Sequence, residues 1–446
     1  MKLILLSGGS GQRLWPLSND IRSKQFIKLL RSSDGKMESM VQRVWGQLEK
    51  TDLHHQAYIA TGKSQVGILQ NQLGMEIPLI IEPSRMDTFP AVALAAAYLF
   101  SEKKVDLDEV VIVLPVDPYV EDGFYKKLFE LEKYLIEEKT DIALLGVKPS
   151  FPSEKYGYIV PTNSNADNPW LYVSAFKEKP SEATAKELID SGALWNCGIF
   201  AFKLGYLLSI LNKMDVIPEF NKMTGIYNDL PKISFDYEVV EKAKNIIVVP
   251  YDGQWKDLGT WNTITEEMGE RVIGRGTLEH SPNTHIVNEL DIPTVVLGIE
   301  NAVVISSPDG ILVADKSLSP KIKGYIPQDI DRVMYEERHW GMSKTLEYRK
   351  VDGQEEILTK RILIRKDKNI SVHYHKCRRE IWTILHGECE ILLGNEKLIL
   401  SSGDTLKIMP NIIHSIRALT DLEFIEIQCG SELTEEDVYR ISLEWL

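Results

Sequence analysis

Over residues 1–272, short apolar runs alternate with longer segments. In these segments, apolar residues recur every three or four positions. The runs predict buried strands, and they lie at 57–60, 79–81, 110–114 and 141–147. The segments at 37–48 and 90–100 have the length and spacing of helices. Strand and helix in alternation predict a Rossmann-like α/β domain, with a mostly parallel sheet covered on both faces. Its ligand crevice is expected at the carboxyl ends of the strands.

After residue 272 the pattern changes to short β-like pieces separated by turn signals. Residues 273–335 form a small β linking region by this pattern, with packing or contact between copies as its expected role. From 336 to 446, short strands are separated by glycine turns at Gly387, Gly394 and Gly403. This spacing predicts an all-β barrel or jelly roll as the last domain.

Charge and composition narrow the choice of partners. The formal net charge of −14 opposes binding to a nucleic-acid backbone or to an anionic membrane. No run of 18 apolar residues occurs, and the chain begins on a predicted strand without a charged leader. The four cysteines contain no C-x-x-C pair, which is typical of reduced thiols. We therefore expect a cytoplasmic protein that acts on small molecules, and assembly into a homo-oligomer stays open.

The first predicted strand ends in a glycine-rich loop, Ser7-Gly8-Gly9-Ser10-Gly11-Gln12-Arg13. Glycines let backbone N–H groups wrap an anion, and cations follow at Arg13 and Lys24, so the loop suits phosphates. A dinucleotide fingerprint is excluded because Leu14 stands where its third glycine is needed. A Walker A loop is excluded because Arg13 stands where it needs serine or threonine. We expect Gly8, Gly9 and Gly11 to contact a nucleotide.

The string from Gly8 to Ser18, followed by Lys24-Gln25-Phe26, closely resembles the signature of sugar-1-phosphate nucleotidyltransferases. It is most similar to that of the mannose-1-phosphate guanylyltransferases, also called GDP-mannose pyrophosphorylases. The resemblance implies an enzyme that converts GTP and mannose 1-phosphate into GDP-mannose and pyrophosphate. It also implies that Arg13 and Lys24 hold the leaving pyrophosphate.

Two aspartates stand where a metal site is expected. Asp117 follows a predicted buried strand, and Asp257 lies close to Gly259 in the sequence. Two carboxylates near phosphates suit Mg²⁺, and in the resemblance both hold this metal. For Asp117 alone, a turn or helix-cap role stays open. A sugar 1-phosphate is already an anionic nucleophile, so we expect catalysis by positioning and charge neutralisation, without a covalent enzyme intermediate.

Three further strings match sugar-side motifs of the same family: Tyr156-Gly157-Tyr158-Ile159, Phe176-Lys177-Glu178-Lys179-Pro180 and Leu194-Trp195-Asn196-Cys197-Gly198-Ile199-Phe200. By this resemblance Gly157 supplies a backbone contact, Glu178 accepts hydrogen bonds from sugar hydroxyls, and Asn196 offers its amide. Lys179 steers the attacking sugar phosphate. Without the resemblance, a Glu-Lys pair at a strand edge would be a solvated surface feature.

One departure from the family pattern concerns the base. Arg85-Met86-Asp87-Thr88-Phe89-Pro90 stands where guanylyltransferases usually show Arg-Asn-Thr-Ala-Pro. We hypothesise that the loop from Glu82 to Thr88 faces the base, with the Asp87 carboxylate accepting from the N1–H and amino group of guanine. The alternative is that Asp87 or Thr88 caps the following helix.

His373-Tyr374-His375, then Glu380 and later His414, has the metal-ligand spacing of a cupin. Three imidazoles and a carboxylate suit Zn²⁺, Fe²⁺, Mn²⁺ or Ni²⁺, and the sequence does not choose among them. Residues 336–446 resemble the cupin of type II phosphomannose isomerases. Their Gln-Met-His-His-His string is replaced here, so we expect metal binding with an inactive or altered isomerase. Solvated histidines without a metal are the alternative.

Other functions stay open at this point. The changes at Asp87 and at Pro118, where the family usually has histidine, favour another sugar or base, such as a heptose 1-phosphate or CTP. A catalytically silent, sugar-nucleotide-binding regulatory protein is a second alternative, although such a protein has no need of both metal aspartates. A cupin isomerase with a sugar-binding front half is a third.

Overall fold

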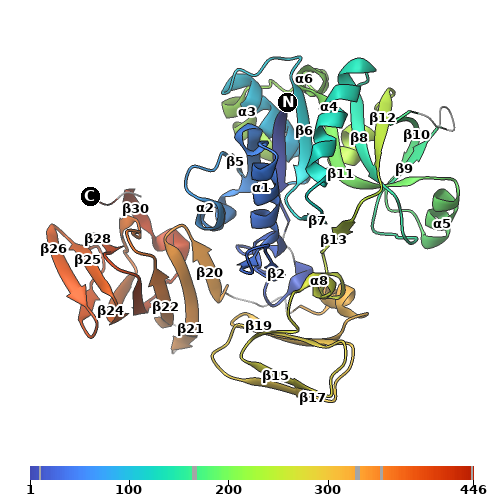
Figure 1. The fold of residues 1–446 in the computed structure, drawn as a ribbon. Coiled ribbons are helices and arrows are strands. Elements are labelled where there is room, and N and C mark those ends of the chain that lie inside the picture. Colours follow the sequence, from blue (N-terminus) through green and yellow to red (C-terminus); the bar gives the residue numbers. More distant parts are fainter. Residues whose placement is uncertain (10–11, 163–167, 327–331, 352–354, 443–444, 446) are drawn as a thin grey trace. The chain divides into compact units, whose positions relative to one another are not determined.

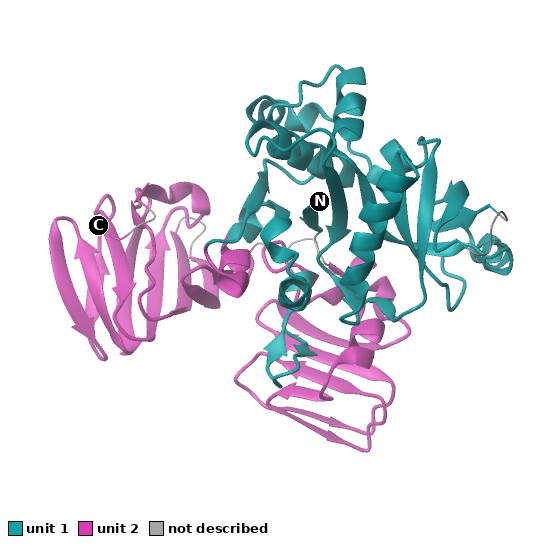
Figure 2. Cartoon of the chain, turned by 45° about the horizontal axis from the view of Figure 1, so that its top comes forward, with its two compact units in different colours: residues 1–9, 25–66, 76–259 teal, residues 10–24, 67–75, 260–446 magenta. Residues whose placement is uncertain are grey.

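The computed structural model describes residues 1–9, 12–162, 168–326, 332–351, 355–442 and 445. Tertiary contacts divide the chain into two compact units, coloured teal and magenta in Figure 2. The first unit comprises residues 1–9, 25–66 and 76–259, and the second comprises residues 10–24, 67–75 and 260–446. Two short segments from the amino-terminal part of the chain therefore belong to the same unit as the carboxyl-terminal part.

A nine-stranded sheet forms the centre of the first unit (Figure 1), in the order β5-β4-β1-β6-β11-β8-β12-β10-β9. The strands are β1 (Lys2–Ser7), β4 (Ala57–Gly62), β5 (Leu79–Glu82), β6 (Val110–Pro115), β8 (Ile142–Val147), β9 (Tyr158–Pro161), β10 (Leu171–Lys177), β11 (Leu194–Lys203) and β12 (Ile246–Tyr251). Two small antiparallel ribbons accompany the sheet, β2 (Leu30–Arg31) with β3 (Met37–Glu38), and β7 (Pro118–Val120) with β13 (Trp255–Asp257).

Strand direction divides this sheet into two regions. β5, β4, β1 and β6 are parallel neighbours, as the sequence predicts. β11 runs antiparallel to both β6 and β8, and β10 pairs antiparallel with β9 and β12. The sheet is therefore mixed rather than mostly parallel. The alternation of elements could not show this, because β9, β10 and α5 intervene between β8 and β11 and the chain re-enters the sheet in the opposite direction.

Helices cover the sheet and bury its strands. They are α1 (Met40–Lys50), α3 (Thr88–Ser101), α4 (Lys127–Glu137), α5 (Glu182–Asp190), α6 (Leu204–Lys213) and α7 (Phe220–Gly225). The helices expected at 37–48 and 90–100 are confirmed as α1 and α3, with ends shifted by a few residues. α1 begins after Ser39, which forms a reciprocal capping box with Gln42. Among the described residues, no helix combines the length and apolar character needed to cross a membrane.

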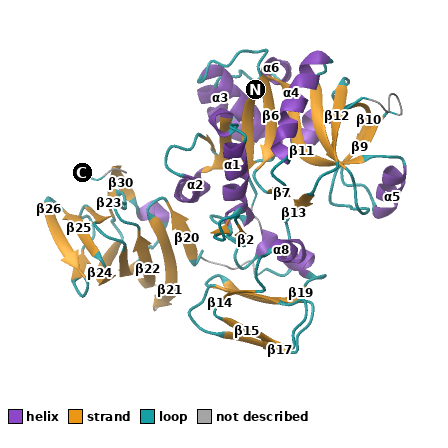
Figure 3. Ribbon diagram, viewed as in Figure 1, coloured by secondary structure: helices purple, strands orange, loops and turns teal. Residues whose placement is uncertain are grey.

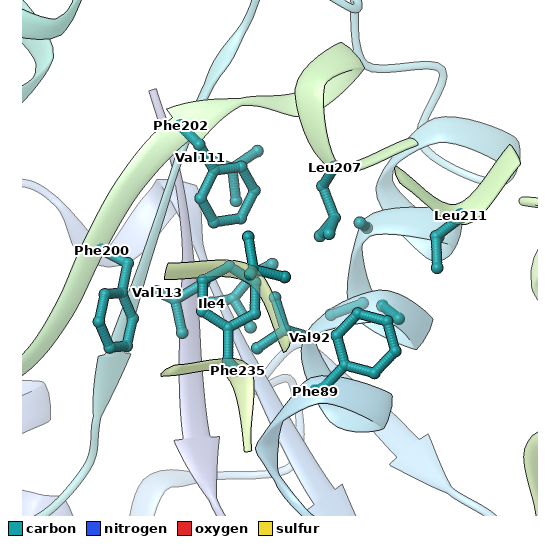
Figure 4. Packing of buried hydrophobic residues seen from close by; sticks show 14 of the residues in the cluster. Ile4, Phe89, Val92, Val111, Val113, Phe200, Phe202, Leu207, Leu211 and Phe235 are labelled. Atoms are coloured by element: carbon teal, nitrogen blue, oxygen red, sulfur yellow. The ribbon is translucent and has the colours of Figure 1, made fainter. Parts of the chain in front are cut away.

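The apolar core shows why the strands read as nearly continuous hydrophobic runs. On one face of the sheet, strand residues pack against α3 and α6 (Figure 4). The side chains labelled there are Ile4, Phe89, Val92, Val111, Val113, Phe200, Phe202, Leu207, Leu211 and Phe235. Leu3, Leu5 and Ile112 alternate with them along the strands and are also fully buried. Both faces are therefore covered, as the α/β prediction requires.

The second unit contains residues 67–73 of α2 (Val66–Leu73), the helix α8 (Trp261–Glu267) and a short stack of strands. β14, β16 and β18 form one parallel ladder, with β19 antiparallel at its edge, and β15 and β17 form another. Ile286, Val296 and Val304 fill the space between them. The bounds are β14 (Val272–Gly274), β15 (Gly276–Glu279), β16 (His285–Asn288), β17 (Thr294–Leu297), β18 (Ala302–Ser307) and β19 (Gly310–Asp315). Successive turns of the chain thus stack like a solenoid.

The carboxyl-terminal part consists mainly of strands and loops (Figure 3). Its sheets run β20-β21-β22-β29-β24-β27 and β26-β25-β28-β23-β30, with antiparallel pairing. The strands are β20 (Tyr335–Arg338), β21 (Gly341–Val351), β22 (Glu355–Ile364), β23 (Val372–Tyr374), β24 (Arg378–His386), β25 (Glu388–Leu393), β26 (Glu396–Ser401), β27 (Thr405–Ile408), β28 (His414–Ala418), β29 (Leu422–Gly430) and β30 (Tyr439–Ser442). Trp382, Ile391 and Phe424 belong to its core, and the predicted all-β fold is confirmed.

Candidate functional site

Gly157, Glu178 and Asn196 come from three separate sequence motifs and meet in the first unit. Gly157 precedes β9, Glu178 follows β10 and Asn196 lies within β11, and β9 pairs with both other strands. The Asn196 N–H donates to the Gly157 carbonyl at 2.8 Å. A Cβ atom at position 157 would overlap Glu178 Oε2 and approach Asn196 Cβ to 3.3 Å. A side chain at position 157 would therefore displace the Glu178 carboxylate from its present position.

The Glu178 carboxylate offers one unused oxygen. Its Oε1 forms an ion pair with Lys179 Nζ, while Oε2 is buried and has no hydrogen-bond partner among the described residues. A buried acceptor without a donor is costly, and a sugar hydroxyl would satisfy it. Lys179 has φ of 45°, a backbone conformation that a non-glycine residue adopts only when its surroundings hold it there.

Charge is retained on Lys179. Burial disfavours its ammonium form, but the hydrogen bond and charge of Glu178 outweigh burial and raise the pKa of Lys179. The Lys179 side chain is 60% exposed, so its cation is also accessible to an anion in solution. The pair thus presents a buried acceptor and an exposed cation side by side.

Asp236 completes this cluster and was not predicted from the sequence. Its Oδ1 accepts a 2.7 Å hydrogen bond from Asn196 Nδ2, and Asn196 Oδ1 accepts from Gly198 N–H at 3.0 Å. The Asn196 amide is therefore fixed in orientation. Burial and the nearby charge of Glu178 raise the pKa of Asp236 to about 6. The only sequence signal was an acidic residue between two aromatic residues, Phe235 and Tyr237.

Aromatic rings adjoin the cluster. Trp195 lies 5.0 Å from both Phe151 and Tyr156, and Tyr156 lies 5.5 Å from Trp255, measured between ring centroids. The indole Nε1 atoms of Trp195 and Trp255 are buried, and in the described part of the chain neither has a hydrogen-bond partner. Aromatic faces with N–H donors suit the apolar faces and hydroxyls of a sugar ring.

Strand pairing places the two predicted magnesium ligands one register position apart. β7 and β13 pair antiparallel in a register that places Asp257 opposite Pro118, the residue after Asp117. Asp117 follows β6, so both carboxylates belong to the carboxyl-end side of the parallel strands. A Cβ atom at Gly259 would lie 3.1 Å from Asp257 Oδ1, so this glycine keeps space beside the carboxylate. A carboxylate with such space beside it suits Mg²⁺, which prefers oxygen ligands and keeps several waters, and the shared site with Asp117 stays a prediction.

Gly8 and Gly9 directly follow β1 at the same end of the sheet. A Cβ atom at either position would meet no described atom within 4 Å, and Gly9 has φ of 111°, which favours glycine. Gln25 Nε2 donates to Ser7 Oγ at 3.3 Å at the base of the loop. The open space suits a ligand that approaches the backbone closely. Gly11 lies outside the described residues.

Arg13 and Lys24 belong to the second unit. Arg13 is exposed in the 3-10 turn Gln12–Leu14, and Lys24 begins the turn Lys24–Phe26. The loop between them is held by bonds to its carbonyl groups. Trp261 Nε1 donates to the Trp15 carbonyl at 3.1 Å, and the Ser307 hydroxyl donates to the Pro16 carbonyl at 2.8 Å.

Glu82 and Asp87 lie on either side of the proposed base loop. Glu82 ends β5, is buried, and accepts a 2.6 Å hydrogen bond from the Tyr227 hydroxyl, while burial raises its pKa. Asp87 is exposed and is the N-cap of α3, with Oδ1 accepting from Thr88 N–H at 2.7 Å. The capping alternative therefore describes the contact that Asp87 makes, and recognition of the base stays a prediction.

The cupin residues form a compact cluster. One ligand atom from each of His373, His375 and His414 lies within 4.8 Å of the others. Glu380 faces two of them, with Oε1 at 3.1 Å from His375 Nε2 and Oε2 at 3.5 Å from His414 Nε2. All four side chains are buried. The spacing read from the sequence thus becomes one set of three imidazoles and a carboxylate.

Backbone carbonyls fix the histidine rings for metal binding. Nδ1 of His373 lies 2.6 Å from the Ser371 carbonyl, and Nδ1 of His414 lies 2.8 Å from the Ile412 carbonyl. A carbonyl only accepts, so each Nδ1 carries the proton and each Nε2 presents a lone pair. In the described residues, His375 Nε2 and His414 Nε2 have no hydrogen-bond donor. The Nε2 lone pairs and the Glu380 carboxylate are all electron-rich, and a cation between them would relieve their repulsion. The four residues therefore fit a divalent metal.

Further buried polar groups surround this cluster, and those of Glu426 and Gln428 were not predicted from the sequence. Trp382 Nε1 donates to both Glu380 Oε2 and Glu426 Oε1 at 3.1 Å, and Gln428 Nε2 donates to Glu380 Oε1 at 3.1 Å. Burial and the charge of Glu380 raise the pKa of Glu426 to about 7. These side chains lie at alternate positions of β24 and β29, so they share one face of each strand. Alternation of polar residues in the sequence does not show whether that face is buried or solvated.

Comparison with known proteins follows the same division of the chain. Residues 2–271 match the family model described as nucleotidyl transferase. The chain belongs to the nucleotidyl transferase family. Residues 330–443 match a second family model, described as mannose-6-phosphate isomerase C-terminal. The α/β fold and the cupin expected from the sequence are therefore confirmed.

Relatives of this nucleotidyl transferase cover nearly its whole length. The xanthan biosynthesis protein XanB of Xanthomonas campestris pv. campestris (strain B100) is 28% identical over 98% of this chain and 97% of its own. The mannose-1-phosphate guanylyltransferase of Escherichia coli (strain K12) is 27% identical over 98% of this chain and 97% of its own. A crystal structure described as mannose-1-phosphate geranyltransferase from Thermus thermophilus covers 73% of this chain and 98% of its own, with TM-score 0.60 and 28% identity.

Proposed function

We propose that this protein transfers the guanylyl group of GTP to mannose 1-phosphate, giving GDP-mannose and pyrophosphate. The observation that carries the proposal is the convergence of Gly157, Glu178 and Asn196 around a buried carboxylate oxygen without a donor among the described residues. Full-length similarity to proteins named mannose-1-phosphate guanylyltransferase supports the choice of substrates.

The residues of the first unit act on the sugar phosphate. Glu178 Oε2 accepts from a sugar hydroxyl, the Asn196 amide donates to another, and the absence of a side chain at Gly157 lets the ring approach the backbone. Lys179 pairs with the 1-phosphate and directs it toward the α-phosphorus of the nucleotide. A phosphate oxygen then forms the new P–O bond as the bond to pyrophosphate breaks. The nucleophile is already an anion, so no general base is needed.

Charge neutralisation supplies the rest of the catalysis. Both reactants are anions, and Arg13 and Lys24 hold the pyrophosphate as negative charge develops on it. Asp117 and Asp257 would hold Mg²⁺, which neutralises phosphate charge when it is bound. Gly8 and Gly9 keep side chains away from the phosphates at the end of β1.

In the cupin, we propose that His373, His375, Glu380 and His414 hold one divalent metal. The fixed Nδ1 atoms and the lone pairs of Nε2 support this assignment. We keep the prediction that isomerase activity is absent or altered, because the string from His373 to Cys377 departs from the usual one. Incubation of the full chain with fructose 6-phosphate tests it, and normal formation of mannose 6-phosphate would overturn it.

Pyrophosphate release, measured with Mg²⁺ for four nucleoside triphosphates against several sugar 1-phosphates, tests the nucleotidyl transfer. We expect a strong signal only with GTP and mannose 1-phosphate. A signal with another pair would retain the chemistry and replace the substrates. The lack of any signal would favour a regulatory sugar-nucleotide-binding protein.

A further inference from the structure

An ion pair with a buried arginine holds the loop that contains Arg13 and Lys24. Arg22, within this loop, donates from Nη1 and Nη2 to the two carboxylate oxygens of Glu289 at 2.9 and 2.8 Å. Glu289 directly follows β16, far away in the sequence. The Arg22 side chain is 6% exposed, and its guanidinium carbon lies 4.7 Å from the centre of the Tyr335 ring. The two-pronged, stacked geometry fixes both position and orientation of the arginine.

A second set of bonds holds the same turn. Asn19 Oδ1 accepts from Arg22 N–H at 2.7 Å, and Asn19 Nδ2 donates to Asp309 Oδ2 at 3.0 Å. Asp309 Oδ1 in turn accepts from Met334 N–H at 2.7 Å. The turn is therefore fixed to the stacked-strand region through both Glu289 and Asp309.

The cost of burying charge favours a role for the Arg22–Glu289 ion pair in positioning the loop rather than in stabilising the fold. Taking charges out of water is expensive, and a buried ion pair repays this cost only when its geometry is good. An apolar pair would have been a cheaper way to attach a loop. A two-pronged contact with a carboxylate, in contrast, holds the Arg22 side chain in one position. Lys24 stands only two residues later in the chain.

We propose that Arg22 and Glu289 are positioning residues that set Lys24, and with it the cation group for the leaving pyrophosphate. Arg22 is buried and both Glu289 oxygens are bonded to it, so the pair acts through the loop rather than on the substrate. The stacked-strand region would then act on nucleotide binding by holding the segment from Asn19 to Lys24 in place. This inference rests on the proposed function, since it takes Lys24 as the pyrophosphate cation.

Steady-state kinetics of the full chain with Mg²⁺ test the inference. Glu289→Gln keeps the shape of the side chain and removes its charge. We expect it to raise the KM for GTP about tenfold, because small misplacements of a binding group cost that much or more. The KM for mannose 1-phosphate should stay within about twofold, because Glu178 and Lys179 are untouched.

Two further variants separate positioning from simple stability. Arg22→Lys keeps the charge but loses the two-pronged contact, so its KM for GTP should also rise about tenfold, and it serves as the test if Glu289→Gln does not fold. Arg271→Gln is the matched control, because Arg271 bonds to the Ser281 and Thr284 carbonyls within the same region. It should lower the melting temperature and leave the KM for GTP unchanged.

The outcomes distinguish this inference from the proposed function. Wild-type turnover tests the proposed function by itself, and the variants are then compared with the nucleotide that the wild type uses. An unchanged nucleotide KM in Glu289→Gln and Arg22→Lys would overturn only the positioning role. The positioning role would also be overturned if the KM values for nucleotide and sugar phosphate rose equally in these variants and in Arg271→Gln. Loss of stability would then explain the rises.

Discussion

Gly157 and Glu178 are matched to each other: the Glu178 Oε2 atom occupies the space that a side chain at position 157 would need. Gly157→Ala should therefore displace the carboxylate. We expect kcat/KM for mannose 1-phosphate to fall about 100-fold, the effect of a misplacement near 1 Å. The KM for GTP should not change. The control is Gly225→Ala in α7, where a Cβ atom meets no described atom within 4 Å. Normal use of mannose 1-phosphate by Gly157→Ala would argue against a sugar site here.

The paired aspartates give a test of magnesium dependence. Asp257→Asn removes one of the two predicted magnesium ligands, whose positions the β7–β13 register places one residue apart. Turnover should fall by about 10²–10³, and it should recover in part at high Mg²⁺ because one carboxylate ligand is left. A titration of turnover against Mg²⁺ measures this. Asp252→Asn, an exposed carboxylate in the same segment, should behave as the wild type. Equal magnesium curves for both variants would refute the assignment.

Asp87 can be tested for base recognition apart from capping. Serine is also a good N-cap, so Asp87→Ser keeps the start of α3 and removes the carboxylate, whereas Asp87→Ala removes both. If the carboxylate reads guanine, both variants should lose the preference for GTP over ATP. If Asp87 only caps the helix, Asp87→Ser should keep this preference, and Asp87→Ala should lose about 1 kcal/mol of stability. The ratio of kcat/KM values for the two nucleotides, with thermal unfolding, decides between them.

One divalent metal per chain is expected in the cupin. Metal analysis of the full chain should find about one equivalent, and a chelator should lower the melting temperature, because a ligand bound only to the folded state stabilises it. His414→Ala should lose the metal. His386→Ala removes an exposed histidine of the same domain and should retain it. Equal metal content in the two variants would mean that the buried cluster is not the binding site.

The raised pKa of Asp236 predicts a pH-dependent stability. Its pKa is about 6 in the folded protein, above its usual 3.8, so the folded state keeps a proton that the unfolded state has lost between these values. The free energy of unfolding should therefore fall as pH rises through this window, by at most about 3 kcal/mol. Asp236→Asn cannot lose that proton. Its stability relative to the wild type should be greater at pH 7.5 than at pH 5, measured by urea unfolding. The same difference at both pH values would contradict the shift.

Much of the fold and many of the candidate residues could be predicted from local patterns. Continuous apolar runs marked β4, β5, β6 and β8, because strands covered on both faces have no polar side. Glycine turns marked the cupin strands, and the spacing of His373, His375 and Glu380 gave a metal cluster that the structure assembles with His414. Such signals arise within a few residues of each other, so a sequence displays them directly.

Tertiary structure decided what depends on residues distant in the chain. The antiparallel course of β11, the hydrogen bond between Asn196 and Asp236, and the ion pair of Arg22 with Glu289 have no local signature. The assignment of residues 10–24 to the same unit as residues 260–446 has none either. Periodicity and turn chemistry report whether a side chain is buried, and packing alone selects which distant group satisfies its charge or hydrogen bond.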